Sequence, residues 1–385
     1  MAGRWQLGFT GLCLFFLMIP VTGVVPVLHE VTVGRFPDLS HFKKHLFMSA
    51  NMIGAFLFAP LAGLLSDWLR QRKWLIAGAL VVNAVALYLM RLEWSYSAYL
   101  GLRFVEGCAH IASLSLLLTL GMEMARAESS GRVMGFLGAS MTLGVAAGAP
   151  LGGIIGRGDP LSIFLYGSFL MAALAVVASC LLHDRMGDRS RFTLLELVGM
   201  LKNQRLLAIP YLFTFVDRLT VGFVVSTMTF YLRSEMGALP QQIGWIMALF
   251  MIPFALLTYP AGRFSQPLNK LKLMIAGSVI YGVIFMAIGL APLGAISWLM
   301  LGGGVAAALM FAPSLVLVQA LSGEHNRALA MSAFNTAGSL GFLLGPLFGG
   351  TMVGLIGYQG AFLATGALEI ICALLFVGFV RRVRV

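Results

Sequence analysis

Long apolar runs separated by short polar segments make up most of this chain. A helix that crosses a bilayer needs about 20 consecutive, mainly apolar residues, and twelve runs reach that length. They lie at about 7–28, 45–66, 73–92, 97–121, 131–156, 161–182, 206–232, 240–262, 272–293, 295–320, 329–356 and 360–380. The pattern therefore predicts an all-α integral membrane protein with twelve transmembrane helices.

One glycine-rich element lies near the end of each half of the chain, and the two elements have the same spacing. Each contains a Gly-x-x-x-Gly step, a nearby proline and a Gly-Gly pair, and equivalent glycines are 197 residues apart. The first contains Gly144, Gly148, Pro150, Gly152 and Gly153, and the second contains Gly341, Gly345, Pro346, Gly349 and Gly350. Small residues four apart let membrane helices approach closely, and a proline bends a helix. Duplication of such an element points to a transporter built from two repeats.

A second repeated element supports the division into halves. The segment from Gly63 to Asp67 and the segment from Gly262 to Gln266 are each followed by basic residues, and they are 199 residues apart. The most charged stretch of the chain separates the halves. We therefore predict a six-helix bundle at 1–182, a cytoplasmic loop at 183–205 and a second six-helix bundle at 206–385.

Composition agrees with a bilayer environment and argues against an enzyme. Hydrophobic residues form 59% of the chain and charged residues 11%, whereas a soluble protein carries about 25% charged residues. The spans leave no room for a soluble catalytic domain. Phosphate-cradling loops, nucleophile elbows and metal-binding motifs are absent from the sequence, so we expect no cofactor and no metal site.

The net charge of +11 would suit a nucleic-acid-binding protein, but its distribution does not. If the N-terminus lies inside, 18 of the 26 basic residues fall on inner loops and termini. These are Arg4, Arg70, Arg72, Lys73, Arg126, Arg132, Arg185, Arg189, Arg191, Lys202, Arg205, Arg263, Lys270, Lys272, Arg327, Arg381, Arg382 and Arg384. This positive-inside asymmetry predicts a multi-pass protein of the inner (plasma) membrane with both termini in the cytoplasm.

Three motifs resemble those of the major facilitator superfamily, over essentially the whole length of the chain. A Gly-x-Leu-x-Asp motif followed by basic residues falls on Gly63, Leu65, Asp67, Arg72 and Lys73. A fourth-span Arg-x-x-Gln-Gly motif falls on Arg103, Glu106 and Gly107, with Glu106 in place of Gln. A fifth-span motif similar to that of the drug:proton antiporter branch fits Gly135, Gly144, Gly148, Gly152 and Gly153, with its proline one place late at Pro150.

The resemblance implies two six-helix bundles around a central cavity that opens alternately to each side of the membrane. It also implies small-molecule substrates, proton coupling and contact with membrane lipid. We expect a monomer that does not bind nucleic acid.

Charges within the fourth span are candidates for proton coupling. Arg103, Glu106 and His110 are spaced i, i+3 and i+7, so they share one helix face. The charge of Arg103 favours an ionised Glu106, while burial favours the neutral acid, so substrate or conformation could tip the balance. The alternative is that Arg103 and Glu106 form a permanently paired structural strut. His110 is either a cavity residue or a packed histidine.

The second half offers Asp217 and Arg218 in the seventh span, which the resemblance makes a cavity-lining helix. Adjacent residues point about 100° apart on a helix, so the two should not occupy one face. Asn51 in the second span is a further candidate cavity residue. Glu369 lies within the last predicted span; the pattern suggests only a hydrogen-bonded or protonated carboxyl there, or a reserve candidate for the proton path.

A gating loop is predicted at the inner ends of the first-half helices. The resemblance makes Gly63 and Asp67 part of a latch. Basic residues of the same loop could pair with Glu123 at the end of the fourth span; they are Arg70, Arg72 and Lys73. Ordinary solvated loop charges are the alternative.

The function favoured by these features is a proton-coupled secondary transporter that exports amphiphilic small molecules by alternating access. One alternative is a proton-coupled importer or facilitator of a metabolite, siderophore or metal ion. A different class, a non-transporting membrane sensor or assembly factor, is less consistent with the gating loop and the two bending elements.

Overall fold

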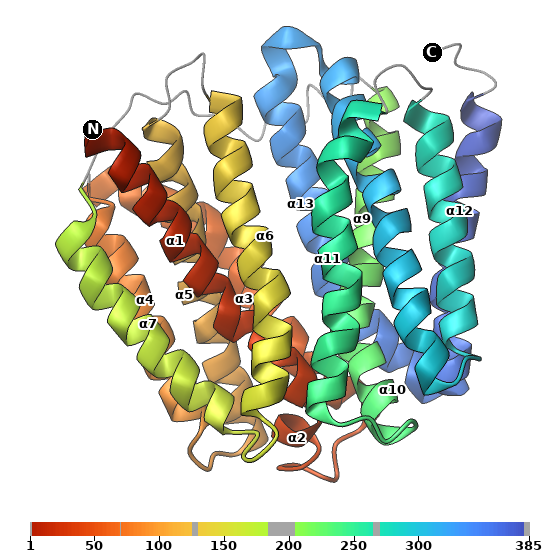
Figure 1. Cartoon of the computed structure of the whole chain (residues 1–385), viewed down its shortest axis with the longest axis horizontal. Coiled ribbons are helices and arrows are strands. Elements are labelled where there is room, and N and C mark those ends of the chain that lie inside the picture. The colour runs from red at the N-terminus through yellow and green to blue at the C-terminus, as the bar shows by residue number, and fades with distance from the viewer. Residues whose placement is uncertain (1, 70, 125–129, 184–204, 265–269, 381–385) are drawn as a thin grey trace. The chain divides into compact units, whose positions relative to one another are not determined.

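The computed structural model describes residues 2–69, 71–124, 130–183, 205–264 and 270–380. Within those ranges the chain is helical and contains no strand. Eleven helical segments among these described residues are long and apolar enough to cross a membrane. The predicted all-α membrane fold is therefore confirmed, and Figure 1 shows its helices.

The first half is built from six long helices and short helical turns. In order these are α1 (Ala2–Gly23), η1 (Val25–Val27), α2 (Leu28–Thr32), α3 (His41–Leu69), α4 (Lys73–Met90), α5 (Tyr96–Glu123), α6 (Ser130–Ile155) and α7 (Ser162–Leu181). The helix α3 continues three residues past the predicted end of the second span, so the backbone of Asp67 belongs to its last turn. The loop 184–204, including most of the predicted inter-bundle segment, lies outside the described residues.

The second half contains η3 (Arg205–Leu207), α9 (Ala208–Phe223), η4 (Val224–Met228), α10 (Thr229–Ser234), α11 (Pro240–Phe264), α12 (Lys270–Ile288) and α13 (Leu293–Val380). The 88 residues of α13 would measure about 130 Å if straight, several times the thickness of the hydrocarbon core. It contains two apolar segments, Leu293–Val318 and Leu329–Val377. The second is 49 residues long and holds Gly357 at φ +72°. A left-handed residue ends a right-handed helix, so this segment accommodates the predicted spans 329–356 and 360–380.

The chain forms two compact units. One comprises Met1–Leu39, Leu46–Asp188 and Gly237–Ala248, and the other comprises Ser40–His45, Arg189–Met236 and Leu249–Val385. Each unit thus includes most of one predicted half, together with a short segment from the other half of the sequence.

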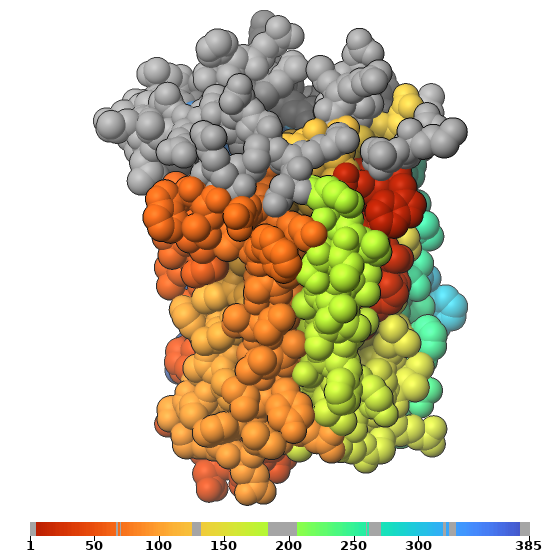
Figure 2. Space-filling view, turned by 90° about the vertical axis from the view of Figure 1, so that its left-hand side faces the viewer, coloured from red at the N-terminus to blue at the C-terminus, as the bar shows by residue number. Residues whose placement is uncertain are grey.

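The long helices pack mainly on helices of their own unit. In the first, α1 packs on α6 and α4 packs on α5 and α7; in the second, α13 packs on α9 and α12. Figure 1 shows α1 and α6 side by side. Figure 2 shows the outward face of α4 and α7, where Val85 is 50% and Val176 63% exposed. Exposed apolar side chains of this kind suit contact with lipid.

Candidate functional site

Arg103 and Glu106 form a buried ion pair on α5. The Arg103 Nη1 lies 2.8 Å from the Glu106 Oε2, and the two side chains are 0% and 1% exposed. Asn51 on α3 donates a hydrogen bond from its amide to the same carboxylate oxygen. The structure therefore brings together three of the residues that the sequence predicted as a coupling and substrate site.

Neighbouring side chains of α3 hold the Arg103 guanidinium. Its Nη2 lies 3.8 Å from the Met48 sulfur, and its centre lies 5.0 Å from the Phe47 ring centroid, a distance typical of a cation–π contact. A Cβ on Gly107 would collide with the Asn51 carbonyl, so glycine permits the close approach of α3 and α5. His110 is buried one turn beyond Glu106, at 7% exposure.

Asp217 and Arg218 are arranged less tightly on α9. Asp217 is 3% exposed, and its Oδ2 lies 3.8 Å from the Arg218 Nε. Its Oδ1 is buried without a hydrogen-bond partner among the described residues. The Arg218 side chain is 29% exposed, and its guanidinium lies 4.5 Å from the Phe311 ring centroid. The two side chains diverge, as expected for adjacent helical residues, so their charged groups form only a long ion pair.

Glu369 is a buried acid for which the sequence suggested only a hydrogen-bonded or protonated carboxyl, or a reserve candidate for the proton path. It is 1% exposed, and its two carboxyl oxygens contact the hydroxyls of Thr220 and Ser278 at 3.0 and 2.7 Å. The only sequence signal was an acid inside an apolar run. Its partners are 149 and 91 residues away, beyond the reach of helical periodicity.

The π-helical turn η4, between α9 and α10, was also not predicted. It places Ser226 and Thr227 in the core, at 0% exposure, and their hydroxyls have no hydrogen-bond partner in the described part of the chain. Single-turn π-helices are frequent at functional sites. Apolar periodicity gives no local signal for such a turn.

The repeated glycines lie where helices approach closely. A Cβ on Gly148 of α6 would collide with the Thr22 hydroxyl of α1, and a Cβ on Gly349 of α13 would collide with the Thr227 hydroxyl of η4. A Cβ on any of the other repeated glycines would collide with main chain or with a ring. The group met is the Phe15 carbonyl at Gly144, the Gly23 carbonyl at Gly152, the Pro240 carbonyl at Gly153, the Phe215 carbonyl at Gly341, the Leu219 carbonyl at Gly345 and the His45 ring at Gly350. Pro150 and Pro346 lie inside α6 and α13.

Part of the predicted gating loop is described. Arg72 forms an ion pair with Glu123, and its Nε donates to the Ser66 hydroxyl at 3.3 Å. Lys73 lies with its ammonium 5.3 Å from the Trp74 ring centroid. Gly63 is exposed. The side chain of Asp67 and the whole of Arg70 lie outside the described residues.

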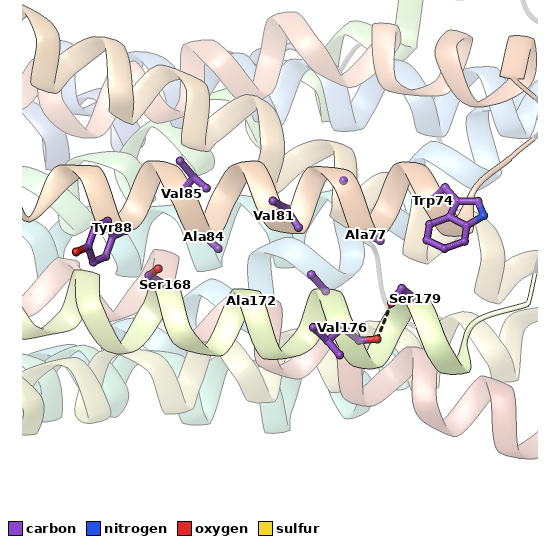
Figure 3. Close-up of a pocket in the computed structure, with 12 residues that line it drawn as sticks. Trp74, Ala77, Val81, Ala84, Val85, Tyr88, Ser168, Ala172, Val176 and Ser179 are labelled. Carbon is purple, nitrogen blue, oxygen red and sulfur yellow. Dashed lines mark hydrogen bonds between the residues drawn. The ribbon is translucent and has the colours of Figure 1, made fainter.

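A groove on the outside of the first unit runs between α4 and α7. It is lined by Trp74, Ala77, Gly78, Val81, Ala84, Val85, Tyr88, Ser168, Ala172, Ala175, Val176 and Ser179, most of them labelled in Figure 3. The lining is almost wholly apolar and contains none of the predicted site residues. It suits an acyl chain of the bilayer better than a polar substrate.

The family model of the Major Facilitator Superfamily matches residues 10–232 and 211–385, which together cover nearly all of the chain. The chain belongs to the Major Facilitator Superfamily. As a member of this superfamily it is a multi-pass membrane transporter of small molecules and not an enzyme.

Relatives in this superfamily include multidrug transporters. The chain is 23% identical over 340 residues to the multi-drug resistance efflux pump PmrA homolog of Lactococcus lactis subsp. lactis (strain IL1403), covering 85% of this chain and 82% of that protein. It is 29% identical over 161 residues to multidrug resistance protein 2 of Bacillus subtilis (strain 168), covering 41% and 40% of the two chains. The nucleoside transporter NupG shares the fold, with a TM-score of 0.81 at 17% identity over 98% of this chain and 99% of that one.

Proposed function

We propose that this protein is a proton-coupled secondary active transporter that exports amphiphilic small molecules by alternating access. It would act as a monomer in the inner (plasma) membrane, in contact with lipid, with both termini in the cytoplasm. The names of the efflux relatives support export. The observation that carries proton coupling is the Arg103–Glu106 pair, buried in an apolar bundle.

The physical basis is the cost of an isolated charge inside a membrane protein. Glu106 is stable as an anion while Arg103 and Asn51 contact it, and it becomes expensive as an anion when those contacts loosen. A change between the two access states that alters these contacts would therefore bind or release a proton. Asp217 would play the corresponding part in the second half, and His110 and Arg218 would contribute to the substrate cavity. Arg103 would set the proton affinity and bind anionic groups.

The test is transport into proteoliposomes of a panel of fluorescent amphiphilic compounds, with and without an imposed pH gradient. Glu106→Gln and Asp217→Asn should each abolish gradient-driven accumulation while exchange of the same compound across the membrane persists. Retention of full gradient-driven accumulation by both variants would refute coupling at these residues. Uptake in the direction of proton flow would support the importer instead, and wild-type flux indifferent to pH would support a facilitator.

A double variant separates coupling from the structural strut. Glu106→Gln alone leaves Arg103 as an unpaired buried cation, which costs about 3–5 kcal/mol of stability. Arg103→Met together with Glu106→Gln removes both charges and should restore thermal stability. If the pair is only a strut, this stable double variant will transport with normal pH dependence. If the pair couples protons, it will fold and fail to accumulate substrate.

A further inference from the structure

The Glu369 carboxyl is 1% exposed among helices of the second unit, and its contacts with described residues are to hydroxyl groups, with no ion pair among them. Its Oε2 accepts a hydrogen bond from the Ser278 hydroxyl of α12 at 2.7 Å. Its Oε1 lies 3.0 Å from the Thr220 hydroxyl of α9. An ionised carboxylate held by two neutral hydroxyls and no positive charge is costly in an apolar interior.

The hydrogen count at Thr220 gives an independent argument. The Thr220 Oγ1 lies 3.0 Å from the Val216 carbonyl and 3.0 Å from Glu369, but a hydroxyl has one hydrogen to donate. A helical threonine commonly donates to the carbonyl four residues earlier. If it does so here, the contact with Glu369 needs a hydrogen from the carboxyl, which then donates to the Thr220 oxygen.

We propose that Glu369 is held as a neutral carboxylic acid and is a second proton-binding site of this half, sharing its proton with Asp217. Asp217 precedes Thr220 by three residues on α9 and so lies on the same helix face. Because Thr220 contacts Glu369, this shared face places the Asp217 carboxyl on the side of α9 that meets Glu369, and a negative charge on one carboxyl would disfavour ionisation of the other.

When Glu369 carries a proton, the positive and negative charges of the surrounding groups are equal in number. Arg218 and Asp217 on α9 supply one positive and one negative charge. The titratable groups within electrostatic range of Glu369 on the other helices are the Tyr281 hydroxyl of α12 and the Cys372 thiol of α13, both neutral. Ionising Glu369 would leave two carboxylates to one guanidinium. A proton lost by Glu369 is therefore best accommodated when Asp217 gains one, because the two acids then exchange roles at constant charge.

This inference deepens the proposed proton coupling and depends on it for a role in transport, but the presence of the proton can be tested without any substrate. The experiment is infrared difference spectroscopy of the full-length protein in liposomes, titrated with pH. We expect the carbonyl stretching band of a protonated carboxylic acid near neutral pH, and we expect Glu369→Gln to remove it. The glutamine amide can donate to Thr220 and its carbonyl can accept from Ser278, so the variant should fold normally.

Matched variants should shift the pH at which the band disappears, in directions that a purely structural Glu369 would not produce. Asp217→Asn removes the neighbouring negative charge, so the band should disappear at lower pH than in the wild type. Ser278→Ala removes a donor that favours the anion, so the band should persist to higher pH. Glu93→Gln, at an exposed position, should leave the band unchanged.

A band that survives unchanged in Glu369→Gln, or a titration that Asp217→Asn does not move, would overturn the proposal. These outcomes are distinguishable from failure of the proposed function. That failure would be seen as pH-independent transport by the wild type, whereas the spectroscopic titration involves no transport.

Discussion

Arg72 and Glu123 form a buried ion pair that joins the predicted gating loop to the end of α5. Their side chains are 2% and 9% exposed, so removing one partner takes a contact from a charge that lies away from water. We expect Arg72→Gln and Glu123→Gln each to lower the free energy of unfolding by about 1.5–3 kcal/mol, the range for a hydrogen bond to a charged group. Thermal unfolding of the purified protein in detergent measures this.

The double variant Arg72→Gln/Glu123→Gln distinguishes a gate from a strut. It should recover much of the lost stability because neither charge then remains at this buried position. If the pair also latches one conformation of the transport cycle, the stable double variant will still transport more slowly than the wild type. Single variants with wild-type melting temperature and flux would exclude both roles.

For the buried acids, residue spacing predicted the contact within one helix but not the partners on other helices. The i, i+3 spacing of Arg103 and Glu106 was enough to pair them. The contribution of Asn51 to that pair depends on the packing of α3 against α5, across 55 residues of sequence. Glu369 was visible as an acid in an apolar run, yet its hydroxyl partners come from two other helices. The spacing of residues within one helix does not predict such partners.

At the scale of helices, glycine allows the contacts that build each unit. Gly148→Ala and Gly349→Ala each place a Cβ against a threonine hydroxyl, on Thr22 and Thr227 respectively. Overpacking of this kind costs about 1–3 kcal/mol. We therefore expect both variants to melt at lower temperature and to transport more slowly.

The same helices provide controls for that prediction. A Cβ at Gly138 in α6 or at Gly354 in α13 would meet nothing within 4 Å. Gly138→Ala and Gly354→Ala should keep or slightly raise the stability, since alanine has the higher helix propensity. Equal loss of stability in all four variants would show that glycine flexibility, and not close approach, is what these helices need.

Helix positions were largely predictable because the bilayer imposes both length and polarity. The predicted span 73–92 became α4 at Lys73–Met90, and 131–156 became α6 at Ser130–Ile155. The breaks within helices were harder. The turn η4 at Val224–Met228 lies within one continuous apolar segment, Ala208–Ser234, so hydropathy gives no sign of it.

At the scale of the whole molecule, the repeat predicted from sequence reappears in the helix contacts. Gly144 of α6 faces the Phe15 carbonyl of α1, and Gly341 of α13 faces the Phe215 carbonyl of α9. These two equivalent glycines thus each lie against a main-chain carbonyl of the first long helix in their half. A repeat of six spans in the same orientation requires the two halves to enter the membrane from the same side.

The number of crossings decides where the C-terminus lies, and this gives the last prediction. If Leu329–Val377 reverses at Gly357, the chain crosses twelve times and the C-terminus shares the side of the N-terminus. If that segment crossed once, the total would be odd and the ends would lie on opposite sides. Because basic residues concentrate on one set of loops, we expect both termini in the cytoplasm.

Reporter fusions measure this arrangement directly. Green fluorescent protein fused after Val385 should fluoresce, because it folds in the cytoplasm, and alkaline phosphatase at the same site should be inactive. Alkaline phosphatase inserted at Glu93, between α4 and α5, or at Asp159, between α6 and α7, should be active. An active phosphatase at Val385 beside active ones at Glu93 and Asp159 would mean an odd number of crossings, and the six-plus-six repeat would then be wrong in its last helix.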